Sequence, residues 1–194
     1  MIPPALLACA PNVAPVTLAA VIGVESGGNP LAVHVNGLGE QPPPARSAQE
    51  AAQIAARFIA HGYSVDLGLM QVNSRNLAAL GVTIEQVLDP CTNIRSGAAI
   101  LTADYAEAAR TRGEGQPALQ AALSAYNTGD FYRGFANGYV ARYYGPNGVP
   151  ALVGGVHQAA ATAPAQRRTI AAAANPYTAD TSIFAREPIN VRIE

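Results

Sequence analysis

Hydrophobic and polar positions along this chain follow mainly the period of an α-helix. Residues 92–112 repeat apolar side chains every three or four positions, which predicts a long helix with one buried side. The apolar positions on that side are Ile94, Ala98, Leu101 and Tyr105. Residues 13–24 are almost wholly apolar and predict a buried helix. Pro15 can open this helix, because a proline in the first turn removes no intrahelical hydrogen bond.

Capping residues and prolines bound further predicted helices. Ser47 and Glu50 have the spacing of a capping box, so we predict a helix that runs through Ala60. Another helix is predicted over residues 117–127, and residues 130–144 are predicted to hold a further helical pair.

Two short segments depart from the helical period. Residues 31–38 alternate valines with polar neighbours and then meet glycines and prolines, so they are predicted to form a short hairpin or an extended loop. Residues 64–73 are predicted to be a short extended or turn segment. The predicted fold class is therefore mainly α (α+β), with a short β or extended segment.

The length of 194 residues suits one domain with a sizeable core. The composition changes after Pro150, because residues 159–174 are largely alanine and the last residues alternate between apolar and polar side chains. We therefore predict a domain over residues 1–150 and a flexible, alanine-rich tail over residues 151–194. The tail either has no partner or adds its last residues as a strand to the sheet edge of a partner.

Charge and composition exclude several classes of protein. The formal net charge of -1 lacks the excess of positive charge that is typical of nucleic-acid-binding proteins. No apolar run reaches the roughly 20 residues that a membrane-spanning helix needs. His34, His61 and His157 are isolated and fit no ligand spacing, so the sequence predicts neither a metal site nor a cofactor.

Glu25 is the first candidate for chemistry, because it ends the apolar run and is followed at once by glycines and a proline. If residues 13–24 form a buried helix, Glu25 lies in an apolar environment of low dielectric constant, which favours its protonated form. Such a carboxyl group can serve as a general acid near neutral pH. The alternative is an ordinary carboxylate at an exposed helix end.

Three motifs follow one another along the chain. They are Glu25-Ser26, Gly68-Leu69-Met70-Gln71 and Ala125-Tyr126-Asn127. In this order and at these separations they resemble the soluble-type (SLT) lytic transglycosylases, whose domain has a goose-lysozyme-like fold. The resemblance runs from about Pro15 to Tyr144. Residues 25–30, the insert around residues 37–44 and residues 89–91 look most like the transglycosylase subunit of type IV secretion systems.

The resemblance implies a lyase that cleaves the bond between N-acetylmuramic acid and N-acetylglucosamine in peptidoglycan. Glu25 would protonate the glycosidic oxygen and then take the proton of the C6 hydroxyl, which attacks C1 and gives a 1,6-anhydro product. No second carboxylate is needed, because an internal nucleophile has a high effective concentration. Asp66 and Asp130 lie near the motifs in sequence, but neither occupies a motif position.

The resemblance also implies which residues contact the substrate. These are Ser26, Gly68, Leu69, Met70, Gln71, Tyr126, Asn127 and Tyr139. Tyr139 matches the late tyrosine that lies against the catalytic carboxylate in the family, where its phenol can orient the acid. Three of these residues have alternatives: Ser26 could simply cap its helix, Met70 could pack in the core, and Tyr126 could equally well pack in the core with a satisfied hydroxyl.

A protein of this resemblance has to cross the inner membrane to meet its substrate. We therefore expect a periplasmic protein from which a signal peptide has been removed, with Met1 added. In that oxidising compartment Cys9 and Cys91 are expected to form a disulfide, and two buried free thiols are the alternative.

The expected partners are peptidoglycan strands and, through the tail, other secretion subunits. The enzyme would open the cell wall locally for assembly of the secretion system. Two other functions stay open. A goose-type lysozyme would share the fold and Glu25 but hydrolyse with water, and a non-catalytic assembly factor would only bind the cell wall.

Overall fold

The structure is a computed structural model that describes residues 2–146, 148–149 and 152. In chain order its elements are α1 (Pro4–Leu7), α2 (Pro15–Ser26), β1 (Val33–Val35), α3 (Ala48–Ala60), β2 (Val65–Leu67), β3 (Val72–Asn73), the 3-10 helix η1 (Ser74–Asn76), α4 (Leu77–Leu80), α5 (Ile84–Val87), α6 (Pro90–Arg112), α7 (Gln116–Thr128), α8 (Arg133–Ala136) and α9 (Ala141–Tyr144). The predicted class, mainly α with a short β segment, is confirmed. The predicted tail lies outside the described residues, apart from Leu152.

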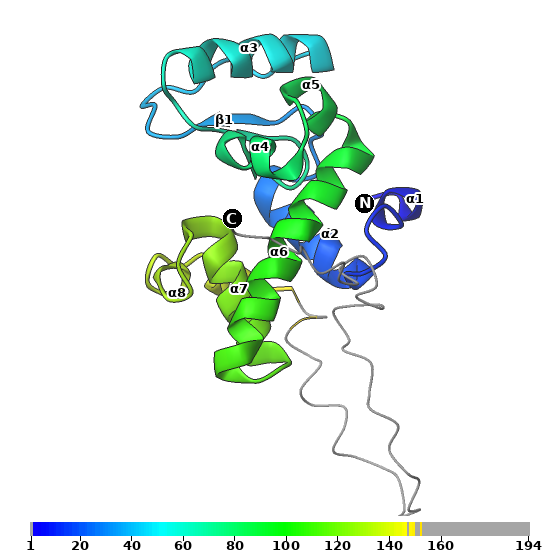
Figure 1. Cartoon of the computed structure of the whole chain (residues 1–194), viewed down its shortest axis with the longest axis vertical. Coiled ribbons are helices and arrows are strands. Elements are labelled where there is room, and N and C mark those ends of the chain that lie inside the picture. The colour runs from blue at the N-terminus through cyan, green and yellow to red at the C-terminus, as the bar shows by residue number, and fades with distance from the viewer. Residues whose placement is uncertain (1, 147, 150–151, 153–194) are drawn as a thin grey trace, which may run out of the picture.

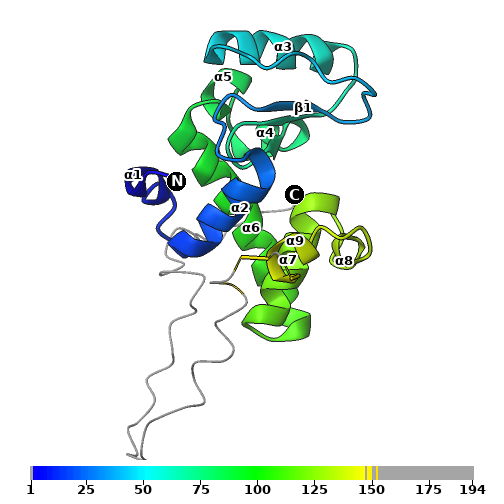
Figure 2. The same ribbon diagram turned by 180° about the vertical axis from the view of Figure 1, so that it is seen from behind.

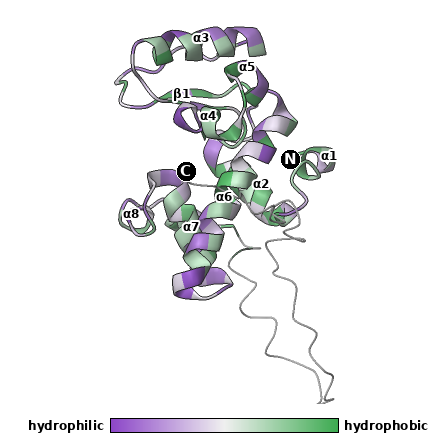
Figure 3. Cartoon of the chain, viewed as in Figure 1, coloured by the Kyte–Doolittle hydropathy of each residue, from purple (hydrophilic) through white to green (hydrophobic). Residues whose placement is uncertain are grey.

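The described chain forms two lobes that α6 joins (Figure 1). The sheet lobe contains β1, β2 and β3 with α3, α4 and α5, and the helical lobe contains α1, α2, α7, α8 and α9. Figure 2 shows α2 and α9 on the face of the helical lobe that is turned away in Figure 1. Each lobe buries its own hydrophobic cluster. Residues of α3 alternate between hydrophilic and hydrophobic (Figure 3), as expected for a helix with one face in a core.

Local sequence explains the two helices that position the site. Pro15 occupies the first turn of α2, and Gly27 ends this helix with a left-handed φ of 63°. Asp89 caps α6, because its carboxylate accepts the backbone N–H of Thr92 at 2.8 Å. This cap starts α6 at Pro90, slightly before the predicted start. The buried positions of α6 include Ile94, Ala98, Leu101 and Tyr105, as predicted.

The three strands form one antiparallel sheet in the order β1-β2-β3. Both segments predicted as extended contain strands, but β1 pairs with β2 and forms no hairpin of its own. Asp66 on β2 lies opposite His34 on one side and Asn73 on the other. Its neighbours Val65 and Leu67 are buried, so Asp66 faces away from the core, because successive strand residues point to opposite faces.

The helices predicted over residues 47–60, 117–127 and 130–144 are present as α3, α7 and the pair of α8 and α9. The short helices α1, η1, α4 and α5 were not predicted. Each spans three or four residues, which is too short to show a period. For α5 a signal existed, because Thr83 and Gln86 form a capping box.

A disulfide joins Cys9 to Cys91 across a sequence separation of 82, as predicted. It ties the segment between α1 and α2 to the first turn of α6. Leu152 is buried in the hydrophobic cluster of the helical lobe. None of the described helices is long and apolar enough to cross a membrane.

Candidate active site

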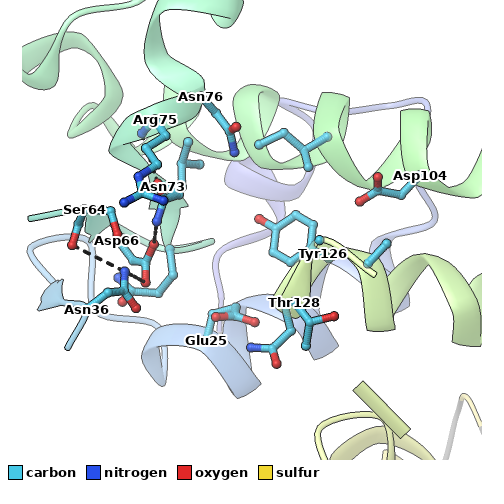
Figure 4. Close-up of a pocket in the computed structure, with 16 residues that line it drawn as sticks. Glu25, Asn36, Ser64, Asp66, Asn73, Arg75, Asn76, Asp104, Tyr126 and Thr128 are labelled. Atoms are coloured by element: carbon cyan, nitrogen blue, oxygen red, sulfur yellow. Dashed lines mark hydrogen bonds between the residues drawn. The ribbon is translucent and has the colours of Figure 1, made fainter. Parts of the chain in front are cut away.

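A cleft of about 520 Å³ lies between the two lobes (Figure 4). Its walls come from the end of α2, from the sheet and η1, from the middle of α6 and from the end of α7. Most of the lining side chains can donate or accept hydrogen bonds, which suits a ligand rich in hydroxyl and amide groups. Among the residues predicted from sequence, those that line the cleft are Glu25, Gln71, Tyr126 and Asn127.

Glu25 occupies the last turn of α2, where the buried helix meets the cleft. Val21 and Ile22, one turn earlier, are fully buried, whereas Glu25 itself is half-buried. Burial raises the pKa of Glu25 above its ordinary value, because the charged form loses hydration, and the negative charge of Asp66 acts in the same direction. The expected environment of a general acid is therefore present.

The turn before α9 (Ala141–Tyr144) and α9 itself contact Glu25 and the end of α2. The Tyr139 hydroxyl donates to Oε1 of Glu25, and the hydroxyl oxygens of Tyr139 and Tyr143 are 2.8 Å apart. Arg142 donates from Nη2 to the carbonyl oxygen of Val24 at 2.6 Å. The hydrogen bond from Tyr139 and the charge of Arg142 both lower the pKa of Glu25, but burial outweighs them. The contact expected between Tyr139 and Glu25 is present.

Ser26 joins the end of α2 to the loop between β2 and β3. Its hydroxyl donates to the carbonyl oxygen of Leu69 at 2.7 Å and accepts the backbone N–H of Gly28 at 3.2 Å. Ser26 is not among the residues that line the cleft. Its hydroxyl thus fixes the loop, and its contact with substrate stays a prediction.

Asn93 clamps this loop from inside the protein. Its Oδ1 accepts the backbone N–H of Met70, and its Nδ2 donates to the carbonyl oxygens of Leu67 and Val87, each at 2.8 Å. Gly68 must be glycine here, because its φ is 72° and an added Cβ would lie 2.4 Å from Nδ2 of Asn93. The buried amide therefore sets the shape of the whole motif.

Within the loop only Gln71 reaches the cleft, because Leu69 and Met70 are buried and pack in the core. Gln71 has a φ of 47°, which is unusual for a residue with a side chain. Its Nε2 donates to the carbonyl oxygen of Gly68 at 2.9 Å. This bond anchors the Gln71 side chain at the cleft, and its contact with substrate stays a prediction.

Tyr126 had two alternatives from sequence, a place at the cleft or packing in the core with a hydrogen-bonded hydroxyl, and the structure combines them. It lines the cleft, and its hydroxyl donates to the carbonyl oxygen of Met70 at 2.7 Å. Gly97 permits this approach, because a Cβ there would lie 2.8 Å from the Tyr126 hydroxyl. Burial raises the pKa of Tyr126 well above its ordinary value, so the phenol stays neutral. Asn127 follows at the cleft, with its Oδ1 bonded to Nδ2 of Asn137 at 3.1 Å.

The structure adds Asp66, which the motifs did not include, to the residues of the cleft. Its Oδ2 accepts a hydrogen bond from Nδ2 of Asn36 at 2.8 Å, and its Oδ1 accepts one from Nδ2 of Asn73 at 2.6 Å (Figure 4). Burial raises the pKa of Asp66, and the two amide donors oppose this rise. The alternation in residues 65–67 is the signal that could have revealed it, because the middle residue of such a strand faces away from the core.

Asp104 on α6 is the third carboxylate that lines the cleft, and sequence reasoning missed it. It is half-buried, and burial alone raises its pKa to about 6. Figure 4 shows it far from Asp66, beyond the ring of Tyr126. Asp130, in contrast, lies outside the cleft and accepts the backbone N–H of Tyr132 at 2.8 Å. Within the described residues no cluster of three or more His, Cys, Asp or Glu side chains is placed to hold a metal ion.

Comparison with known proteins agrees with this geometry. The family model described as Transglycosylase SLT domain matches residues 5–143. "Protein virB1" of Agrobacterium fabrum (strain C58) is 49% identical over 132 residues, which are 68% of this chain and 53% of that protein. "Type IV secretion system protein virB1" of Brucella abortus biovar 1 is 44% identical over 140 residues, which are 70% of this chain and 58% of that protein.

The chain thus spans only about half of the length of the curated relatives that it matches. No solved structure matches it. The family match, however, includes both lobes, the whole cleft and the disulfide. Because this match covers more than half of the sequence, the chain belongs to the SLT transglycosylase domain family.

Proposed function

We propose that this chain is a lytic transglycosylase that cleaves the β-1,4 bond between N-acetylmuramic acid and N-acetylglucosamine and forms a 1,6-anhydro end. The observation that carries the proposal is the position of Glu25. Its carboxyl group ends a buried helix, accepts a hydrogen bond from Tyr139 and opens on a polar cleft. Family membership supports the same reaction.

In the first step protonated Glu25 gives its proton to the glycosidic oxygen. The raised pKa supports this role, because the acid has to keep its proton near neutral pH. As the bond to the leaving sugar breaks, positive charge at C1 is stabilised by the acetamido carbonyl of the substrate. The hydrogen bond from Tyr139 stabilises the Glu25 carboxylate that remains.

In the second step the Glu25 carboxylate takes the proton of the C6 hydroxyl while the C6 oxygen attacks C1. One C–O bond breaks and one forms, Glu25 recovers its proton, and no water is consumed. The attack is intramolecular, so positioning supplies much of the rate. Gln71, Tyr126 and Asn127 are the residues that would hold the sugars in this geometry.

In cells the reaction would open peptidoglycan locally during assembly of a type IV secretion system. The names of the relatives at 44% and 49% identity support this role. A periplasmic location suits the disulfide between Cys9 and Cys91, because disulfides persist in oxidising compartments.

Asp66 favours a second candidate, a lysozyme-like hydrolase. Glycoside hydrolases ordinarily use two carboxylates, one as acid and one as nucleophile or base. Asp66 lines the same cleft as Glu25, and Asn36 and Asn73 hold its two oxygens in place. A carboxylate so placed can stabilise positive charge or orient an attacking water molecule.

Digestion of purified peptidoglycan, followed by mass analysis of the soluble fragments, tests both candidates. A lytic transglycosylase releases fragments that are one water lighter than hydrolysed ones. Glu25→Gln should lower the rate by roughly 100- to 10,000-fold, the usual contribution of a general acid, and should leave circular dichroism unchanged. Hydrolysed ends that disappear in Asp66→Asn would refute the first candidate and support the second.

Two further outcomes have distinct meanings. Turnover by Glu25→Gln near the wild-type rate would show that the acid lies elsewhere. Binding to peptidoglycan without any soluble product would show that the domain is a non-catalytic assembly factor.

A further inference from the structure

A pair of tyrosines forms a buried chain behind Glu25. The hydroxyl oxygens of Tyr143 and Tyr139 are 2.8 Å apart, and Tyr139 donates in turn to Oε1 of Glu25. Tyr143 is 0% exposed and Tyr139 is 5% exposed. Neither residue is among those that line the cleft. Tyr143 has no role in the proposed reaction, although burying a hydroxyl beside the acid costs free energy unless that hydroxyl is hydrogen-bonded.

The chemistry of these groups fixes the direction of the chain. A carboxylate only accepts hydrogen bonds, so Tyr139 has to use its one hydroxyl hydrogen on Glu25 whenever Glu25 is ionised. Tyr143 is then the donor to Tyr139. Among the described residues its hydroxyl has no other acceptor, so a reversed chain would leave a buried donor unpaired. Oε2 of Glu25 stays available to the substrate.

We propose that Tyr143 is a positioning residue that strengthens the hydrogen bond from Tyr139 to Glu25 and so makes Glu25 a better proton donor. A hydroxyl that accepts a hydrogen bond becomes a stronger donor itself. The stronger bond favours the carboxylate that forms when the proton moves to the glycosidic oxygen. The role in catalysis rests on the proposed function, whereas the effect on the acidity of Glu25 does not.

Other groups also act on Glu25 and have to be separated from this effect. Arg142 on α9 lowers the pKa of Glu25, and Asp66 on β2 raises it. Tyr126 on α7 is neutral and close enough for the charge of Glu25 to raise its pKa. Replacing Tyr143 by phenylalanine leaves all three of these side chains in place, so a changed pKa of Glu25 is attributed to the lost Tyr143 hydroxyl.

The central test is Tyr143→Phe, which removes the hydroxyl and keeps the buried ring. We expect NMR titration of the Glu25 carboxyl carbon to show a raised pKa, because the carboxylate loses part of its stabilisation. The basic limb of the pH profile should move to higher pH. On peptidoglycan strands kcat should fall about two- to fivefold, since cooperativity adds a fraction of one charged hydrogen bond, and KM should not change.

Tyr144→Phe is the matched control, because it makes the same change at the adjacent residue of α9. The Tyr144 hydroxyl donates to Oε1 of Gln116 at 2.7 Å, whereas the Tyr143 hydroxyl pairs with that of Tyr139. This variant should keep the wild-type kcat and the wild-type pKa of Glu25. Equal effects of both substitutions would mean that α9 packing alone is responsible, and would overturn the proposal.

Tyr139→Phe completes a double-mutant cycle. If Tyr143 acts through Tyr139, adding Tyr143→Phe to Tyr139→Phe changes neither kcat nor the pKa of Glu25 any further. The same loss in both backgrounds, or an unchanged pKa of Glu25 in Tyr143→Phe, would refute this role. If the wild type releases no anhydro fragments, the proposed function fails, and the NMR titration still decides what Tyr143 does.

Discussion

Replacing Cys9 and Cys91 together by alanine removes a bond that joins two residues 82 positions apart in sequence. In the chain-entropy account a loop of that length restricts the unfolded chain by about 15 cal/mol/K, which is about 4.5 kcal/mol at 25 °C. For a domain of this size such a loss lowers the melting temperature by roughly 10 to 20 °C. We expect the double variant to fold, but with a substantial part of its free energy of unfolding lost.

Urea unfolding of the wild type and the double variant, each with and without dithiothreitol, measures this contribution. The reduced wild type should match the double variant, which separates the bond from the packing of the sulfur atoms. Activity should also fail at a lower temperature in the variant. Cys91 lies in the same turn of α6 as Asn93, which clamps the loop of Met70, and Cys9 precedes the helix that carries Glu25.

Two results would contradict this reasoning. A difference in the free energy of unfolding below about 1 kcal/mol would show that the unfolded chain gains little freedom when the bond is removed. Two thiols that titrate in denatured, non-reduced protein would show that the bond does not form at all.

Three further predictions concern stability. Asp104→Asn should raise the free energy of unfolding at pH 7 by about 1 to 2 kcal/mol, after a discount for solvent screening of this half-buried group. The wild type should lose stability as the pH rises from 4 to 6, because a raised pKa favours folding only while the group is protonated, and melting measured across this pH range checks it. Gly97→Ala should cost about 1 to 3 kcal/mol in urea unfolding, because its Cβ would lie 2.7 Å from Cβ of Met70. A chain that ends at Pro150 should cleave peptidoglycan but melt earlier than one that keeps Leu152, whose burial contributes about 1.5 to 3 kcal/mol.

Long periodic segments and motifs carried most of the correct sequence predictions. The period in residues 92–112 predicted α6, because a helix of that length repeats its apolar face many times. The apolar run before Glu25 predicted the buried helix and the burial that raises the pKa of the carboxyl group at its end. In each case the physical signal lies within one continuous stretch of sequence, so no knowledge of tertiary contacts was needed.

The residues that hold the site in place could not be predicted from local sequence patterns. Asn93 has a polar side chain on an otherwise ordinary helical face, and only the loop packed against it explains why it is buried. Tyr143 looks like one of several tyrosines near the end of the domain, and its role depends on the position of Tyr139 beside Glu25. Such roles arise from contacts between residues far apart in sequence, which a single sequence does not encode locally.

Asp66 illustrates how much chemistry can depend on the pairing of three short strands. It faces the cleft because Asp66 pairs with His34 on β1 and Asn73 on β3, with Val65 and Leu67 pointing into the core. A slip of one residue in this register would bury the carboxylate and expose both apolar neighbours, so burial of the core also fixes the second carboxylate in the cleft. A one-carboxylate mechanism predicts that Asp66→Asn keeps the anhydro product and changes only its rate, and the mass of the released fragments measures that difference directly.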